Sequence, residues 1–509
     1  MALVVRLVLA WVFLGSVDTV NTISAMPVAL RHGVVYIPYF PLITNWLNLA
    51  AVIDVHWLKW AHDLGLRPWA LPVAFVPKLL PCLADSMLAA WLSMDRGQSV
   101  RNRRLAAWTY ATCPLPLIIV CLQGQWDSVW VFFVILAIAI ASGERTTAKA
   151  RAIAGVLLGL GVLVKPVPLI MLPLLFSPFG KRVSISTWIR ELLPTVLAFL
   201  GVVLVAFSWF ALEGINLSKN VHGVIRYSTD PKLSLFGISR LQLLNHFGNS
   251  TTGLRDLSIL VGAVLILRFH LSHHPLDPMI TAAALLLITP ALGGIAPQYL
   301  LWPLPFLLAT GRLRVTAVYG ALSSLVVLAF FIVPRASHIV GENNDLFLPI
   351  RRLGFLAIPT GVRNWLATGA PVKLWHPVGN FILPVAMLAL AVFVLRQELH
   401  WRGSATIPLH PKAQRDSWRL ASILAVVVIV MGIVYELGPY RADSRDLSNH
   451  LVDLLHAYPF IRPPILQPFP GHLIGAFQAG SPWLSALTWF GALIAVWSII
   501  TWRALRKAG

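Results

Sequence analysis

The amino-acid sequence predicts an all-α integral membrane protein with about 12–14 transmembrane or re-entrant helices and several long extracytoplasmic loops. The first observation is compositional: of 509 residues, 57% are hydrophobic and only 12% are charged, and the mean hydropathy is +0.75. A soluble domain carries about 25% charged residues, and a soluble fold of this composition would expose large apolar patches. The second observation is that apolar segments recur along the whole chain between short and long loops.

Each apolar segment is a predicted helix, and several are shorter than the ~20 residues that a perpendicular membrane helix needs. We expect the short ones to be broken, re-entrant or shielded by neighbouring helices. The clearest case flanks Lys165 and Pro166, because proline cannot continue the helical hydrogen bonds. In chain order the predicted segments are 2–17, 69–93, 105–122, 128–142, 152–164, 166–178, 191–212, 256–270, 279–293, 298–311, 315–333, 377–395, 420–436 and 481–502.

The distribution of basic residues predicts the side of the membrane that each loop faces. With a cytoplasmic N-terminus and alternating loops, 22 of the 40 Lys and Arg residues fall on the cytoplasmic side, Arg6 among them. The outward loops hold 16, in roughly twice the length. Such an excess is typical of cytoplasmic loops, so both termini are predicted to be cytoplasmic. The long loops near 18–68, 213–255, 334–376 and 437–480 then face outward.

No separable soluble domain is indicated. Residues 1–334 are interpreted as a membrane core, and residues 335–509 as a C-terminal membrane region with two long outward loops. The N-terminal segment has no convincing A-x-A-like cleavage site, so it is interpreted as an uncleaved first membrane helix. The Arg-, Ala- and Trp-rich composition favours a bacterial inner membrane.

Several function classes are disfavoured. The net charge of +20 fits the cytoplasmic excess and anionic lipid headgroups better than nucleic acid, because no basic stripe lies on a soluble domain. P-loop, dinucleotide-binding, H-E-x-x-H and G-x-S-x-G motifs do not occur. The three cysteines form no C-x-x-C pair, so neither a disulfide framework nor a metal site is expected.

Polar residues near predicted helix ends are the candidates for chemistry, because polar groups at membrane depth are costly. Asp18 follows the first apolar segment, with Asn21 beside it, and a partly desolvated carboxylate there suits a general base. A solvated helix-end residue is the simpler alternative. The outward loop near His222 and Arg226 could supply cations or be an ordinary headgroup-binding surface.

Four further motifs place polar residues within or between apolar segments. Lys78 and Asp85 lie seven residues apart in one segment, where they could share a helix face or form a structural ion pair. Gln125 and Asp127 belong to a tight turn, in which Asp127 could also be a turn former. Lys165 lies at the tip of the proline-broken pair and could neutralise a phosphate or only extend toward headgroups. Gln298 and Tyr299 open a further segment from the outside.

The order of these motifs resembles the GT-C superfamily of polytopic glycosyltransferases that use polyprenyl-phosphate sugars, nearest its mannosyltransferase-like branch. The resemblance spans roughly residues 1–310, from D-x-x-N at Asp18 through K-L-x-P-x-x-A-D, G-Q-W-D-S and G-x-x-x-K-P-x-P to P-Q-Y-L-L-W-x-x-P. It implies that Asp18 is the base and that Asp127, Lys165, Gln298 and Tyr299 line an outward cavity. Some branches have two adjacent acids in the first loop; here Asp54 is the second carboxylate, and Asp54 and Asp127 stay alternatives.

The predicted activity is therefore transfer of a sugar, with mannose favoured, from a polyprenyl-phosphate donor to a hydroxyl acceptor on a glycan or lipid-glycan. No cofactor or divalent metal is expected, and membrane lipids are the other partners. A lipid-linked donor needs no nucleotide-binding fold, since its tail dissolves in the bilayer while its sugar lies at the interface. The competing class is a secondary transporter or lipid flippase, which Lys78 and Asp85 keep open.

Overall fold

The computed structural model describes residues 1–12, 75–94, 98–122, 124–142, 147–176, 185–212, 277–332, 381–400 and 482–506, together with residues 46, 50, 53, 64, 218, 262 and 423. Its elements are α1 (Ala2–Val12), α4 (Phe75–Leu92), α5 (Val100–Thr112), α6 (Pro114–Pro116), the π-helix η2 (Leu117–Leu122), α7 (Asp127–Ala141), α8 (Ala148–Val162), the 3₁₀-helix η3 (Val167–Phe176), α9 (Ile185–Leu212), α13 (Pro278–Gly293), the 3₁₀-helix η5 (Pro297–Leu301), α14 (Leu304–Ala309), α15 (Leu313–Ile332), α20 (Leu383–His400) and α24 (Pro482–Arg506).

The described residues are mostly helical, and no β-strand occurs among them. Three of the helical stretches are long and apolar enough to cross a membrane, namely Phe75–Leu92, Val100–Cys121 and Leu192–Trp209. Predicted segments 256–270 and 420–436 lie outside the described ranges, so the total number of helices stays a prediction. The helical, membrane-compatible fold class is confirmed at this coarser level.

Capping side chains explain where several helices begin. The Ser99 side chain accepts a hydrogen bond from the Asn102 backbone N–H, and the Thr147 side chain accepts one from Ala150, so α5 and α8 both start at a capped turn. At α13, Asp277 accepts from Met279 at 2.7 Å, and Pro278 occupies the first helical position, where its missing N–H costs nothing.

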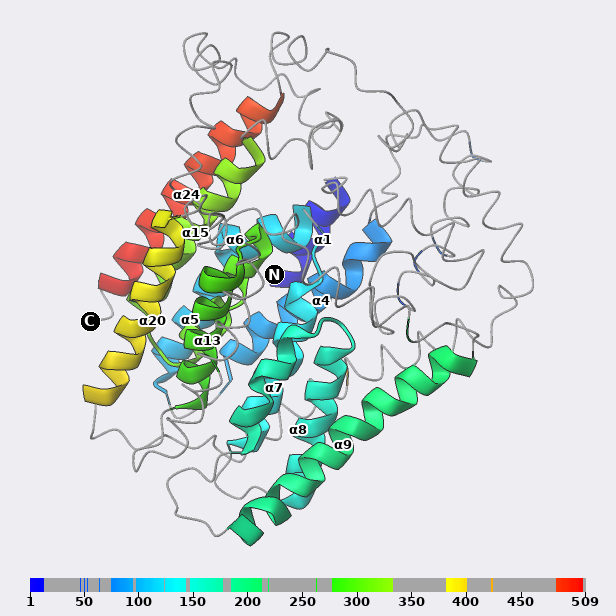
Figure 1. Ribbon diagram of the computed structural model, residues 1–509. Coiled ribbons are helices and arrows are strands. Elements are labelled where there is room, and N and C mark those ends of the chain that lie inside the picture. Colours follow the sequence, from blue (N-terminus) through cyan, green and yellow to red (C-terminus); the bar gives the residue numbers. More distant parts are fainter. Residues whose placement is uncertain are drawn as a thin grey trace, which may run out of the picture.

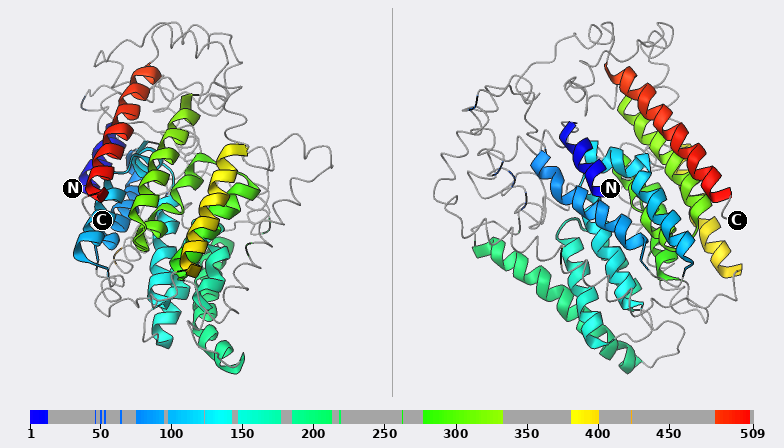
Figure 2. Two further views of the ribbon diagram at one scale, coloured as in Figure 1. Left: turned by 90° about the vertical axis from the view of Figure 1, so that its left-hand side faces the viewer. Right: turned by 180° about the vertical axis from the view of Figure 1, so that it is seen from behind.

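The described helices pack side by side in a bundle (Figures 1 and 2). Helix α8 lies between α7 and α9, α13 runs beside α20, and α15 runs beside α24; α1 packs against α4. The close approach of α8 to α9 depends on Gly155, since a Cβ there would lie 2.2 Å from the Thr195 backbone oxygen. The outer face of α9 is apolar and exposed, as at Leu197 and Leu204.

The break at Pro166 falls where the sequence predicts it. Helix α8 ends at Val162, and after Pro166 the chain continues as the 3₁₀-helix η3. Helices α7 and α8 are antiparallel neighbours (Figure 1). The first residue of α7, Asp127, and Lys165 beyond the end of α8 therefore lie at the same end of the bundle.

Basic residues gather at a different place. The Gln98 side chain donates to the Ala309 backbone oxygen at 2.7 Å, and Arg312 Nη2 donates to the Val394 oxygen at 3.5 Å. These contacts bring together the start of α5, the junction of α14 and α15, and α20 near its end. Along the chain, the start of α5 is separated from Asp127 by the candidate span Val100–Cys121. These helix ends carry Arg101, Arg103, Arg104, Arg312, Arg314 and Arg396.

Candidate functional site

A glycine turn positions Asp127. Gly124 has a φ of 68°, a left-handed conformation that glycine adopts without a Cβ clash. The turn is closed by the Gly124 N–H, which donates to the Val120 oxygen, and by the Gln125 N–H, which donates to the Ile119 oxygen. Helix α7 then starts at Asp127, where a carboxylate also interacts favourably with the helix dipole.

Close packing of α8 on α7 brings Lys165 to Asp127. At Gly161 a Cβ would lie 3.4 Å from the Pro168 ring and 3.6 Å from the Trp130 backbone oxygen, so the last turn of α8 fits between them. The Lys165 backbone N–H closes this turn by donating to the Gly161 oxygen at 3.1 Å. The lysine side chain then reaches the first turn of α7.

The chain from Ala296 to Trp302 supplies the third side of the site. Pro297 starts the 3₁₀-helix η5, and the Tyr319 hydroxyl of α15 donates to the Leu300 oxygen at 2.7 Å. Tyr299 and Trp302 face the same way from this turn, with ring centroids 4.1 Å apart. Both rings reach Lys165.

These segments form what we call the Asp127 cluster, defined by Asp127, Trp130, Lys165, Tyr299 and Trp302. One carboxylate oxygen, Asp127 Oδ1, accepts hydrogen bonds from Lys165 Nζ at 2.9 Å, from Trp302 Nε1 at 2.6 Å and from Trp130 Nε1 at 3.2 Å. The Asp127 side chain is 1% exposed, whereas that of Lys165 is 26% exposed. The cluster therefore presents one cation at the surface and keeps its anion inside.

Aromatic rings complete the surroundings of the lysine. Its ammonium nitrogen lies 5.1 Å from the Tyr299 ring centroid and 5.3 Å from that of Trp302, within the ~6 Å range of cation–π attraction. Trp302 also meets Trp130 edge-on at 5.2 Å. The ammonium is held by a carboxylate and two rings, with part of the side chain left open to the exterior.

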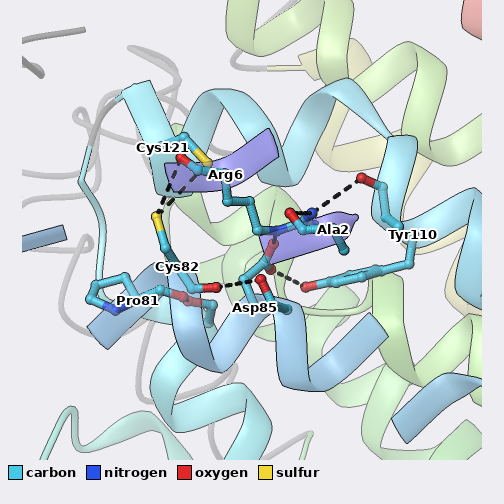
Figure 3. Close-up of polar contacts among 10 residues, drawn as sticks. Ala2, Arg6, Pro81, Cys82, Asp85, Tyr110 and Cys121 are labelled. Carbon is cyan, nitrogen blue, oxygen red and sulfur yellow. Dashed lines mark hydrogen bonds and ion pairs between the residues drawn. The ribbon is translucent and has the colours of Figure 1, made fainter. Parts of the chain in front are cut away.

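A second charged cluster lies deeper in the bundle (Figure 3). The Arg6 guanidinium of α1 pairs with the Asp85 carboxylate of α4, which also accepts a hydrogen bond from the Tyr110 hydroxyl of α5. Arg6 Nη1 donates to the backbone oxygens of Ala2 and Ala111, both at 3.2 Å. Arg6 and Asp85 side chains are both 0% exposed, so this Arg6–Asp85–Tyr110 cluster is sealed.

One expectation from the sequence is corrected by this cluster. The partner of Asp85 is Arg6 and not Lys78, because seven residues along a helix separate two side chains by about 10 Å. Arg6, which the charge distribution assigns to the cytoplasmic side, is buried within the bundle. A buried carboxylate needs a countercharge, and the first helix supplies it.

Lys78 is also fully buried, on the same helix as Asp85. Beside it, the Pro77 backbone oxygen accepts a hydrogen bond from Trp46 Nε1 at 3.1 Å. Trp46 is 3% exposed and contacts the Trp126 ring edge-on at 6.3 Å. A residue of the long 18–68 segment thus packs against the turn that carries Asp127.

The remaining predicted site residues fall into two groups. Gln125 and Gln298 are both half-buried. Gln125 lies two positions before Asp127, and Gln298 is the neighbour of Tyr299 in the chain. Asp18, Asn21, Asp54, His222 and Arg226 lie outside the described residues.

Sequence reasoning missed four polar partners. Trp130 and Trp302 donate their indole N–H groups to Asp127, and Arg6 and Tyr110 bind Asp85. Spacing carried a signal for Trp130 alone, because it follows Asp127 by three residues and such residues share a helix face. Nothing in the sequence marks Arg6 as the partner of a residue 79 positions away.

Within the described part of the chain, no group of three or more His, Cys, Asp or Glu side chains could hold a metal ion. Cys82 and Cys121 are the nearest approach to a soft-ligand site, with sulfur atoms 4.0 Å apart (Figure 3). No protein-family model, curated protein or solved structure matches this chain.

Proposed function

We propose that this protein is a membrane glycosyltransferase that moves a sugar, with mannose favoured, from a polyprenyl-phosphate donor to a hydroxyl acceptor on a glycan or lipid-glycan outside the cytoplasm. The observation that supports this proposal most is the partly exposed Lys165 ammonium in the Asp127 cluster. Lys165 and Trp302, which lie 38 and 175 residues from Asp127 in the sequence, both contact its carboxylate there. The three residues belong to G-Q-W-D-S, G-x-x-x-K-P-x-P and P-Q-Y-L-L-W-x-x-P, which are among the motifs on which the resemblance to the GT-C superfamily rests.

The chemistry assigns each group a task. The acceptor oxygen forms a bond to the anomeric carbon while the bond from that carbon to the phosphate oxygen breaks, and the polyprenyl phosphate leaves with both bonding electrons. The acceptor proton goes to a carboxylate. Positive charge beside the leaving phosphate stabilises the transition state. Lys165 is assigned this role, with His222 and Arg226 as further candidate cations.

The base is assigned to Asp18, with Asp54 and Asp127 as alternates. The surroundings of Asp127 weigh against it as the base, because its side chain is 1% exposed and one of its oxygens already accepts three hydrogen bonds. Asp18→Asn should lower transfer by roughly 10²–10⁴-fold, the usual contribution of general base catalysis. Near-normal transfer by Asp18→Asn together with an inactive Asp54→Asn would move the role to Asp54.

The proposed setting is a multi-pass protein of the bacterial inner membrane, with both termini in the cytoplasm. The excess of Lys and Arg residues in the loops assigned to the cytoplasmic side supports this orientation. A single cysteine at position 104, exposed at the start of α5, tests it after the native cysteines are replaced. Labelling of position 104 by an impermeant thiol reagent in intact cells would contradict the orientation.

The transporter or flippase alternative depended on Lys78 and Asp85 as ionisable groups within the membrane. Asp85 is paired with Arg6 and bound by Tyr110, so it holds three helices together and has little freedom to exchange an ion. Lys78 alone gives the alternative less support than the Asp127 cluster gives the enzyme.

The direct experiment supplies purified protein in lipid vesicles with radiolabelled polyprenyl-phosphate mannose, glucose and arabinose and a pool of candidate acceptors. We expect one donor to be consumed with label appearing in an acceptor, and the mannose donor to be preferred. Absence of any transfer, with accumulation of the intact donor on the opposite leaflet, would favour the flippase.

A further inference from the structure

We infer that Asp127, Tyr299 and Trp302 form a binding seat for a primary ammonium group, which Lys165 fills from within the chain and which a free alkylammonium ion fills when the Lys165 side chain is removed. The inference rests on the proposed function in one respect only, namely that the seated ammonium faces the donor phosphate. In that case Asp127 is a positioning residue, and the proton acceptor is another carboxylate.

The charge of the seat is provided by a buried anion. Asp127 is 1% exposed and meets Lys165 Nζ at 2.9 Å. The indole N–H groups of Trp302 and Trp130 donate to the same oxygen, so they fix the direction of the carboxylate whether or not a cation is present. Hydrogen bonds to an ionised acceptor are stronger than those between neutral groups.

The shape of the seat is provided by the aromatic rings. Tyr299 and Trp302 lie against each other with centroids 4.1 Å apart, and both are about equally far from the ammonium nitrogen. Trp302 is 2% exposed and is held by its own hydrogen bond and by the edge of Trp130. These rings are fixed by protein contacts, so the seat does not depend on Lys165 for its form.

The route into the seat is the space of the lysine stem. Lys165 is 26% exposed, so its side chain runs from the surface to the buried carboxylate. Replacement by alanine removes the methylene groups and the ammonium, and surrounding structure relaxes only in part around such a deletion. The n-propylammonium ion has the size and charge of the part removed.

The first experiment measures the thermal unfolding of Lys165→Ala over a series of n-propylammonium concentrations. Binding to the folded protein raises the unfolding temperature in a saturable way. We expect saturation in Lys165→Ala, no saturable rise in the wild type, and at least about tenfold weaker binding in the matched Lys165→Ala/Asp127→Asn variant. n-Propanol serves as the uncharged control. Equal responses to n-propanol, or in the double variant, would overturn the inference.

The same amine series is run in the transfer assay. We expect n-propylammonium to restore a measurable part of the transfer lost in Lys165→Ala and n-propanol to restore none, which a purely structural lysine would not produce. A saturable thermal shift without rescue would leave the seat in place and reject the link between the seat and the donor phosphate. A missing thermal shift would reject the seat whatever the transfer result.

A second measurement decides the question if Lys165→Ala does not fold. The rate at which an amine-reactive ester acylates Lys165 is compared by mass spectrometry in the wild type and in Asp127→Asn. Lys149, exposed at the start of α8, is the internal reference. Loss of the carboxylate should release the ammonium and raise the Lys165 rate relative to Lys149 by about tenfold or more. Equal relative rates would overturn the inference.

Discussion

The two charged clusters contain the same kind of contact and differ in access. In the Arg6–Asp85–Tyr110 cluster both charged side chains are 0% exposed, and the groups come from α1, α4 and α5. In the Asp127 cluster the anion is equally buried, but its lysine is 26% exposed. A sealed ion pair cannot change partners without unfolding its surroundings, whereas a cation at an opening can meet a ligand. Access, more than charge, separates a structural ion pair from a candidate site.

The largest expected effect comes from breaking the sealed pair. Asp85→Leu leaves the Arg6 guanidinium buried without its countercharge, so it should lower the free energy of unfolding by about 3–5 kcal/mol. Thermal unfolding in detergent or nanodiscs measures this. The Arg6→Met/Asp85→Leu double variant should regain most of the loss. A single variant as stable as the wild type would mean that the sealed cluster does not hold the helices.

Removing the lysine side chain of the Asp127 cluster should affect sugar transfer more than protein stability. Lys165→Ala should weaken use of the lipid-phosphate donor by about 2–4 kcal/mol of transition-state stabilisation. The comparison of donor kinetics with the unfolding temperature checks it, with Lys149→Ala as the matched control. Unchanged donor kinetics in well-folded Lys165→Ala would indicate that Lys165 only extends toward lipid headgroups.

Two matched substitutions, each of which removes one hydrogen-bond donor, sharpen the comparison of the two clusters. Tyr110→Phe and Trp302→Phe each remove one hydrogen-bond donor from a buried carboxylate, a contact to a charged group worth about 1.5–3 kcal/mol. Tyr110→Phe should lower the unfolding temperature at unchanged transfer per folded molecule. Trp302→Phe should lower transfer as well, and the two assays run in parallel would show it. Identical profiles would remove the distinction between the clusters.

The smallest effect concerns helix α8, whose end leads to Lys165. A Cβ at Gly155 would collide with the Thr195 backbone oxygen, so Gly155→Ala should push α8 from α9 and cost about 1–3 kcal/mol. Gly201 of α9 is the control, because a Cβ there meets nothing within 4 Å. Gly201→Ala should be neutral or slightly stabilising in thermal unfolding. Equal destabilisation by both would contradict the close packing.

Local patterns predicted much of this structure. The apolar segments and the break at Pro166 follow from composition and spacing. The meeting of Asp127 and Lys165 also follows, because two neighbouring antiparallel helices return the chain to the same end. The partner of Asp85 could not be predicted, since the pairing joins helices 79 residues apart and periodicity carries no information on such contacts.

Trp302 shows the same limit in the site itself. Its motif suggested an outward segment, but its hydrogen bond to Asp127 spans 175 residues and depends on how η5 docks on α7. The orientation of a ring toward a carboxylate is set by that packing and has no separate signature in sequence.

The measurement that tests the account most directly is transfer from polyprenyl-phosphate mannose by the reconstituted wild type, Lys165→Ala and Lys149→Ala, with the folded fraction of each determined in the same vesicles. The account predicts label in a hydroxyl acceptor with the wild type and Lys149→Ala. It predicts a loss of about 30-fold to 10³-fold with Lys165→Ala, the equivalent of about 2–4 kcal/mol. Wild-type rates from folded Lys165→Ala, or no transfer by the wild type from any polyprenyl-phosphate sugar, would contradict it.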